Sequence, residues 1–218
     1  MDYSCKRQTL TTETAMKKLG PTLAAAFVLS AASAFAQNGP AVTARATIES
    51  VAADGASLAV RTRDGKQETV RLNDKTAVTL VVPASLSDAK KGAFIGVAAL
   101  PGEGDELKAM EVHIFPESMR GLGEGFRPFD LAPGSTMTNG SVAARVDSVQ
   151  GSKLTVTYKG GQQTIVVDPK APVVGFAPGS RSDLKPGAAL IARGTRAADG
   201  TIEAARILVG KDSLVPPM

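Results

Sequence analysis

Cysteine, tryptophan and histidine are almost absent from this 218-residue chain, which has one Cys, no Trp and one His. The cysteine, Cys5, lies in front of a segment with the features of a cleaved leader, so the remaining chain has no disulfide and no thiol chemistry. Nucleophilic catalysis lacks its usual residues too, because there is no Gly-x-Ser-x-Gly motif and one histidine would have to serve as the base. We therefore expect a protein that is not an enzyme.

Aromatic residues are also scarce, at 4% of the chain, and the net charge is only +4. Without residues 1–36 the chain keeps 21 basic and 19 acidic residues, a balance of +2. Barrels that bind single-stranded nucleic acid use stacking aromatic side chains and a basic groove. We therefore expect no nucleic-acid partner and a core built from small aliphatic side chains.

The first 36 residues contain a secretory signal. Lys17 and Lys18 precede an apolar run at 19–32, and small residues suited to cleavage follow and end at Ala36. We predict a signal peptide at 16–36 and interpret residues 1–15 as a misannotated extension, with translation starting at Met16. The run is too short and too rich in alanine for a membrane span, although an uncleaved N-terminal anchor is the alternative. The sequence thus predicts a periplasmic or secreted protein without a membrane span after cleavage.

From residue 42 onward, short apolar runs alternate with turn signals, and helical periodicity is absent. Asp64-Gly65 is typical of a hairpin turn, because both residues accept a positive φ at low cost. Residues 85–91 are polar and predict at most one helical turn. The strands expected in the first half span residues 46–51, 58–60, 68–72, 78–82, 94–100 and 107–115.

The second half of the chain has the same pattern as the first. Residues 146–149 resemble 48–51, residues 154–156 resemble 58–60, residues 182–187 resemble 87–92, and residues 199–204 resemble 105–109. Five or six short strands in each copy predict a small closed barrel, because closure removes exposed strand edges.

We predict an all-β fold of two tandem OB-like β-barrels, with a β-sandwich as the alternative. The predicted parts are module 1 (42–115), a Gly/Pro-rich linker (116–140), module 2 (141–210) and a tail (211–218).

The repeated pattern of Leu-x-Val, a glycine turn and Ser-Asp-x-Lys-x-Gly resembles small bacterial extracytoplasmic β-domains, a family of unknown function. The linker, with Phe115-Pro116-Glu117 and Gly123-Glu124-Gly125, is similar to the alphaproteobacterial secreted type. The pattern of those proteins often has a histidine where this chain has Phe126. The resemblance implies a fold and a location outside the cytoplasm, and it implies no chemistry.

His113, the only histidine, is placed by comparison with the second copy. Alternation puts Met110 and Val112 on one strand face, and Glu111 and His113 on the other. The matching second-copy residues are apolar, so we expect Met110 to point into the core. His113 would then lie on the outer face beside Glu111, where the linker can cover it.

A copper-type site is one hypothesis for this region. His113, Met119 and Met137 offer one imidazole and two thioethers, and such soft ligands suit Cu(I). Methionine also fills gaps in cores with few aromatic residues, so a structural role is the alternative. Zinc fits less well, because its usual sites need several His or Cys ligands.

Charged residues of both signs follow one another in the linker. They predict either ion pairs that hold this segment on the modules or a recognition surface made by Arg120, Glu124, Arg127 and Phe129. Acid–base chemistry by Glu117 and Glu124 has no support from spacing.

The glycines of the linker also lack the strand–helix unit and the Lys-Ser/Thr ending of a phosphate loop. Asn139-Gly140-Ser141 matches a glycosylation acceptor, but we interpret it as a turn.

The sequence thus predicts an exported, non-enzymatic cell-envelope protein that binds a small ligand or another envelope protein. The alternative is a periplasmic copper-binding protein that uses His113 and methionines. No other cofactor is expected.

Overall fold

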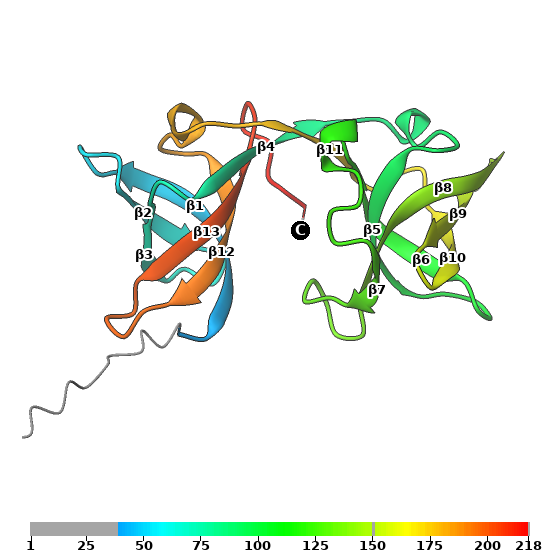
Figure 1. Ribbon diagram of the computed structural model, residues 1–218, viewed down its shortest axis with the longest axis horizontal. Coiled ribbons are helices and arrows are strands. Elements are labelled where there is room, and N and C mark those ends of the chain that lie inside the picture. Colours follow the sequence, from blue (N-terminus) through cyan, green and yellow to red (C-terminus); the bar gives the residue numbers. More distant parts are fainter. Residues whose placement is uncertain (1–38, 150, 218) are drawn as a thin grey trace, which may run out of the picture. The chain divides into compact units, whose positions relative to one another are not determined.

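Thirteen β-strands and three short 3₁₀ helices form the part of the chain described by this computed structural model, residues 39–149 and 151–217 (Figure 1). No α-helix occurs in these residues, and the prediction of an all-β barrel fold is confirmed. The described residues belong to one compact unit. The predicted extension and signal peptide lie outside the described residues.

The strands of the first half lie where the sequence predicts them. They are β1 (Ala41–Val51), β2 (Ser57–Thr62), β3 (Gln67–Arg71), β4 (Ala77–Pro83), β5 (Phe94–Pro101) and β6 (Leu107–Ile114), with helix η1 (Leu86–Asp88) between β4 and β5. Gly65 closes the β2–β3 hairpin with a φ of 84°, a conformation that costs glycine little.

The remaining elements are η2 (Glu117–Met119), β7 (Gly125–Pro128), β8 (Thr136–Ser148), β9 (Gly151–Tyr158), β10 (Gly161–Val167), β11 (Val173–Pro178), η3 (Arg181–Asp183), β12 (Ala189–Arg196) and β13 (Ile202–Gly210). Helices η1 and η3 both begin with a capping box, in which a serine and an aspartate three residues later satisfy each other's backbone N–H groups. Asn139 and Ser141 lie within β8, so the interpretation of this tripeptide as a turn is wrong. The last residues of the predicted linker likewise belong to β8.

Two closed rings of five strands can be followed through the backbone pairing. The first ring runs β1–β2–β3–β13–β12 and returns to β1, with β3 and β13 parallel. The second ring runs β8–β9–β10–β6–β5 and returns to β8, with β10 and β6 parallel. Five strands closed in this order match the OB-like barrel that the sequence predicts.

Each ring combines strands from both halves of the chain, which differs from the predicted modules 42–115 and 141–210. In Figure 1 the blue strands of the first ring lie beside orange and red ones, and the green strands of the second lie beside yellow ones. Strands β4 and β11 pair antiparallel with each other, while β4 also pairs with β13 and β11 with β6. Because β5–β6 and β12–β13 have similar patterns, the sequence does not show which pair completes which ring.

The two rings have separate aliphatic cores. The first core includes Leu58, Val60 and Ile207, and the second includes Val97 and Leu154. Neither core contains an aromatic residue, as the composition predicts. Filling each ring with branched side chains removes apolar surface from water and stabilises the fold by about 1.5–3 kcal/mol for each fully buried side chain.

One part of the internal alignment is wrong. The sequence comparison matches Val146 with Ile48, but Val146 is 65% exposed and Ile48 is buried. Ile48 pairs with Val60 on β2, and Val142 pairs with Val156 on β9. The residue equivalent to Ile48 is therefore Val142 and not Val146. A bulge in each of these long strands shifts the alternation, which a comparison of short motifs does not detect.

A smaller buried cluster lies between the rings. Val81 of β4, Val174 of β11, Ile191 of β12 and Leu208 of β13 pack together, and Leu214 of the predicted tail packs against them. Strand alternation therefore gives β12 and β13 a second buried face, opposite the ring core. This second face forms one side of the candidate site.

Candidate functional site

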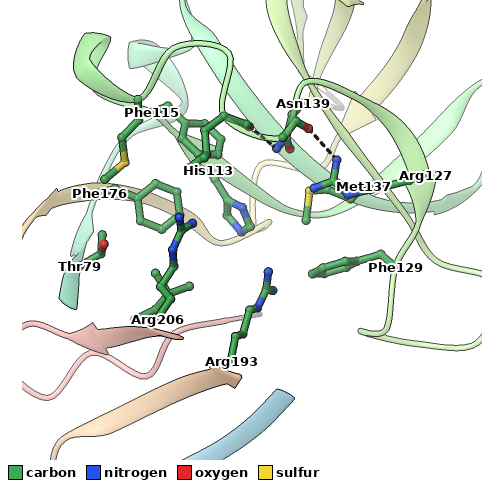
Figure 2. A pocket seen from close by; sticks show the side chains of 14 residues that line it. Thr79, His113, Phe115, Arg127, Phe129, Met137, Asn139, Phe176, Arg193 and Arg206 are labelled. Atoms are coloured by element: carbon green, nitrogen blue, oxygen red, sulfur yellow. Dashed lines mark hydrogen bonds between the residues drawn. The ribbon is translucent and has the colours of Figure 1, made fainter. Parts of the chain in front are cut away.

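A cavity of about 180 Å³ lies between strands of the two rings (Figure 2). Residues of the second ring and of the segment between β6 and β8 form one side, and residues of β12 and β13 form the other (Figure 2). Thr79 of β4 and Phe176 of β11 complete the lining. The lining residues are Thr79, His113, Phe115, Met119, Leu122, Gly123, Arg127, Phe129, Met137, Asn139, Phe176, Arg193, Arg206 and Leu208.

Gly96 of β5 makes room for the wall of the second ring. It is paired with His113 on one side and with Asn139 on the other, so the three residues form one row across the sheet. A Cβ atom at position 96 would lie 2.7 Å from Asn139 Oδ1, 3.0 Å from Phe115 and 3.4 Å from His113 Nδ1. Glycine is therefore required for these side chains to lie together above the strand.

His113 and Glu111 form a buried polar pair in this wall. His113 Nε2 lies 2.9 Å from Glu111 Oε1, and the two residues are 2% and 1% exposed. Buried polar groups are stable only when they are paired, and this contact fixes the orientation of the imidazole ring. The ring faces away from the aliphatic core, as alternation predicts, and it is covered by other side chains.

Met110 does not point into the core, which corrects that prediction. It is half-buried and is not a member of either aliphatic cluster. The pairing of β5 with β6 shifts between Ala98 and Ala99, so Met110 falls in a bulge and Ala109 points inward in its place. Alternation counted from the sequence assumes an unbroken strand, and one extra residue reverses it.

Two arginines lie side by side on the opposite wall. Arg193 of β12 and Arg206 of β13 are direct partners in the strand pairing. Their neighbours Ala192 and Ile207 belong to the first core, so both arginines occupy the other face, toward the cavity. Like charges directly opposite each other on adjacent strands are destabilising unless another group compensates them.

The charge around Arg193 is mainly positive. Burial lowers the pKa of Arg193 below its ordinary value, and the positive charges of Arg45, Arg206 and Arg127 lower it further, against the attraction of Asp130. Arginine nevertheless remains charged in proteins. In the described ranges 39–149 and 151–217, neither Arg193 nor Arg206 has a carboxylate within salt-bridge distance.

The segment after β7 reaches toward these arginines. The ring of Phe129 lies 5.9 Å from the guanidinium carbon of Arg193, within the range of a cation–π contact. Asp130 accepts a hydrogen bond of 3.0 Å from Arg45 of β1. Burial would raise the pKa of Asp130, but Arg45 and Arg193 together hold it below its ordinary value.

Some polar atoms at the site have no protein partner. Arg193 Nε and Asn139 Oδ1 are buried and lack a hydrogen bond within the described part of the chain. Asn139 donates to the carbonyl of Leu122 through its amide nitrogen, at 3.0 Å. A buried donor on a charged group is unfavourable when it is unpaired, and an acceptor atom of a ligand would satisfy it.

Five of the seven predicted site residues come together at the cavity. These are Arg127 and Phe129 from the predicted recognition surface, and His113, Met119 and Met137 from the predicted metal site.

Arg120 and Glu124 are outside the cavity lining and hold the segment in place. Arg120 donates to Glu117 at 2.7 Å and to the carbonyl of Gly92 at 3.0 Å, and Glu124 accepts from the backbone of Lys159 at 3.0 Å. Glu117 and Glu124 therefore have structural partners.

Sequence reasoning missed Phe176, Arg193 and Arg206. Phe176 lies in β11, whose place beside β6 depends on the exchange of strands between the rings. The two arginines carry a usable signal, because each interrupts an apolar run at a position that alternates away from the core. Their closeness to the linker could not be predicted, because it depends on contacts between segments that are distant in sequence.

Metal ligands of the common kind are not gathered in the described residues, where no three His, Cys, Asp or Glu side chains are placed to hold an ion. In the same part of the chain, no helix is long and apolar enough to cross a membrane. Comparisons of the chain with protein-family models, with curated proteins and with solved structures found no match.

Proposed function

We propose that this protein is an exported binding protein whose cavity holds a small anionic ligand. One observation carries the proposal: Arg193 and Arg206 lie side by side on the cavity wall without a carboxylate partner in the described residues. The signal sequence at 16–36 and the resemblance to bacterial extracytoplasmic β-domains support a location in the periplasm or outside the cell.

Charge and geometry both favour an anion at this place. The planar guanidinium group offers several N–H donors in a fixed arrangement that matches a carboxylate or a phosphate. An anion between Arg193 and Arg206 would reduce their mutual repulsion and provide an acceptor for Arg193 Nε. Arg127, held by its hydrogen bond to the Gly123 carbonyl at 2.7 Å, adds a third positive charge to the lining.

The cavity suits a small molecule better than a macromolecule. Pockets for drug-sized ligands usually enclose about 300–1,000 Å³. The cavity here encloses about 180 Å³, which favours a ligand of few atoms. The envelope-protein partner that the sequence also allows has less support, because Arg120 and Glu124 have partners within the chain.

Calorimetric titration with a panel of small organic acids and inorganic phosphate tests the proposal. We expect at least one anion to bind, and we expect Arg193→Gln to weaken this binding at least tenfold. Arg181→Gln is the matched control, because Arg181 is a partly exposed arginine outside the cavity lining. The proposal fails if no anion binds, or if Arg193→Gln and Arg181→Gln bind the same anion as tightly as the unchanged protein.

Copper binding is the second candidate, and a specific observation favours it. His113, Met119 and Met137 all line the cavity, and Glu111 engages Nε2 of His113. Histidines that bind metals commonly contact a carboxylate through one nitrogen and the metal through the other. The nearby arginines oppose a cation, so this candidate ranks second. Cu(I) titration followed by the NMR signals of His113 decides it, and unchanged signals exclude the copper site.

A further inference from the structure

Phenylalanine is concentrated at the cavity. The chain has seven Phe, of which five follow residue 36. Three of these, Phe115, Phe129 and Phe176, line the cavity, while neither aliphatic core contains any. Phe94 packs edge-on against Phe115, with 5.4 Å between ring centroids. A protein that fills its cores without aromatic rings thus places most of them at one site.

Phe115, Phe176 and His113 form a continuous aromatic wall. The centroids of Phe115 and Phe176 are 5.1 Å apart, and those of His113 and Phe176 are 5.7 Å apart. Both distances lie in the range of favourable ring packing. Because Glu111 and Phe94 support this wall from behind, its rings are ordered before a ligand arrives, which reduces the entropy cost of binding.

Positive charge lies next to the aromatic wall. Figure 2 shows the Arg206 side chain extending toward Phe176 and the Arg193 side chain extending toward Phe129, with His113 above them. A ligand in this cavity therefore meets guanidinium groups and aromatic surface side by side. Inorganic phosphate or a short aliphatic acid would satisfy the arginines but leave the aromatic wall in contact with water.

We infer that the ligand is a small aromatic carboxylate. Its acid group binds Arg193 and Arg206, and its ring packs on Phe115 and Phe176. The cavity of about 180 Å³ lies below the usual range for drug-sized ligands, which favours one ring with an acid group. This inference rests on the proposed function, because it requires the arginines to bind an anion.

Benzoate is the probe that tests the inference, with acetate and phosphate as anions without a ring and benzamide as a ring without charge. In calorimetry with the mature protein, we expect benzoate to bind at least tenfold more tightly than each of the other three. If no anion binds, the proposed function itself fails. If acetate or phosphate binds as tightly as benzoate, anion binding stands and the aromatic ligand class is wrong.

Phe176→Leu separates ring packing from charge. Leucine keeps the site apolar, so we expect the fold to persist and benzoate affinity to fall at least fivefold while acetate affinity stays unchanged. Phe126→Leu is the matched control, because Phe126 is 44% exposed and lies outside the cavity lining. Equal benzoate affinity in both variants and the unchanged protein overturns the inference, as does the absence of NMR contacts between benzoate ring protons and Phe176.

Discussion

Replacing Arg206 by glutamine is expected to stabilise the ligand-free protein while it weakens anion binding. Arg206 is directly paired with Arg193 across β12 and β13, and its charge disfavours the charged form of Arg193. In the described residues its side chain has no ion pair that the substitution would break. Glutamine keeps most of the aliphatic stem, so the main change is the loss of one positive charge.

The size of this effect follows from cross-strand pairing. A favourable or unfavourable pair of charges on adjacent strands contributes roughly 0.2–1 kcal/mol. Because Arg206 is exposed, solvent screening keeps the gain toward the lower part of that range. For a chain of this length, 1 kcal/mol shifts the melting temperature by about 2–4 °C, so a gain in the lower part of the range predicts a rise of up to about 2 °C.

Urea unfolding at low and high salt, without added organic anions, measures the effect. We expect Arg206→Gln to raise the free energy of unfolding at low salt and to lose most of this gain at high salt, because salt screens the repulsion. A clear loss of stability at low salt would contradict this expectation, because it would show that Arg206 has a favourable contact in the unliganded protein.

Three further predictions concern the site and the fold. Gly96→Ala is expected to lower the free energy of unfolding by about 1–3 kcal/mol and to abolish ligand binding, because the new Cβ would lie 2.7 Å from Asn139 Oδ1. An unchanged free energy of unfolding and an unchanged ligand affinity would contradict this prediction. The pKa of Asp130 is lower in the folded protein than its value of about 3.9 in the unfolded chain. The ionised carboxylate therefore stabilises the fold above pH about 3.9, and this stabilisation is lost as the pH falls through the lower pKa of the folded protein. Asp130→Asn should therefore lose less stability than the unchanged protein on acidification from about pH 5 to pH 3, and parallel curves in urea unfolding would oppose this assignment. A fragment of residues 141–210 is expected to form a strand-exchanged dimer, in which β12–β13 of one copy take the place of β5–β6 beside β8–β10 of the other, because β11 separates β10 from β12 within one copy; a folded monomer by light scattering would argue against it.

The strands and turns could be predicted from the sequence because they depend on local patterns. Asp64-Gly65 and the alternation around Val60 indicate a hairpin wherever the rest of the chain lies. The composition of each ring could not be predicted, because β5–β6 and β12–β13 have the same alternation and either pair completes a closed barrel. Tertiary packing decides which of these two strand pairs completes which ring, and this packing includes the Val81 cluster between the rings.

The site was partly predictable for the same reason. His113, Met119, Arg127, Phe129 and Met137 lie within 25 residues of one another, so their closeness could be expected from the sequence. Arg193 and Arg206, on the opposite wall, reach the site only because β12 and β13 belong to the other ring. Gly96 gave no signal of its own, because the need for a glycine there appears only when the neighbouring strands are paired.

The Nε–H signal of Arg193 reports directly on anion binding by the paired arginines. In an NMR titration of ¹⁵N-labelled protein comprising residues 37–218 with benzoate, this buried, unpaired donor should gain an acceptor. We predict a downfield, saturable shift of the Arg193 Nε–H resonance. In the Phe176→Leu variant, the same shift should require a higher benzoate concentration. An Arg193 signal that stays in place in the presence of excess benzoate, acetate or phosphate would show that the paired arginines do not bind anions.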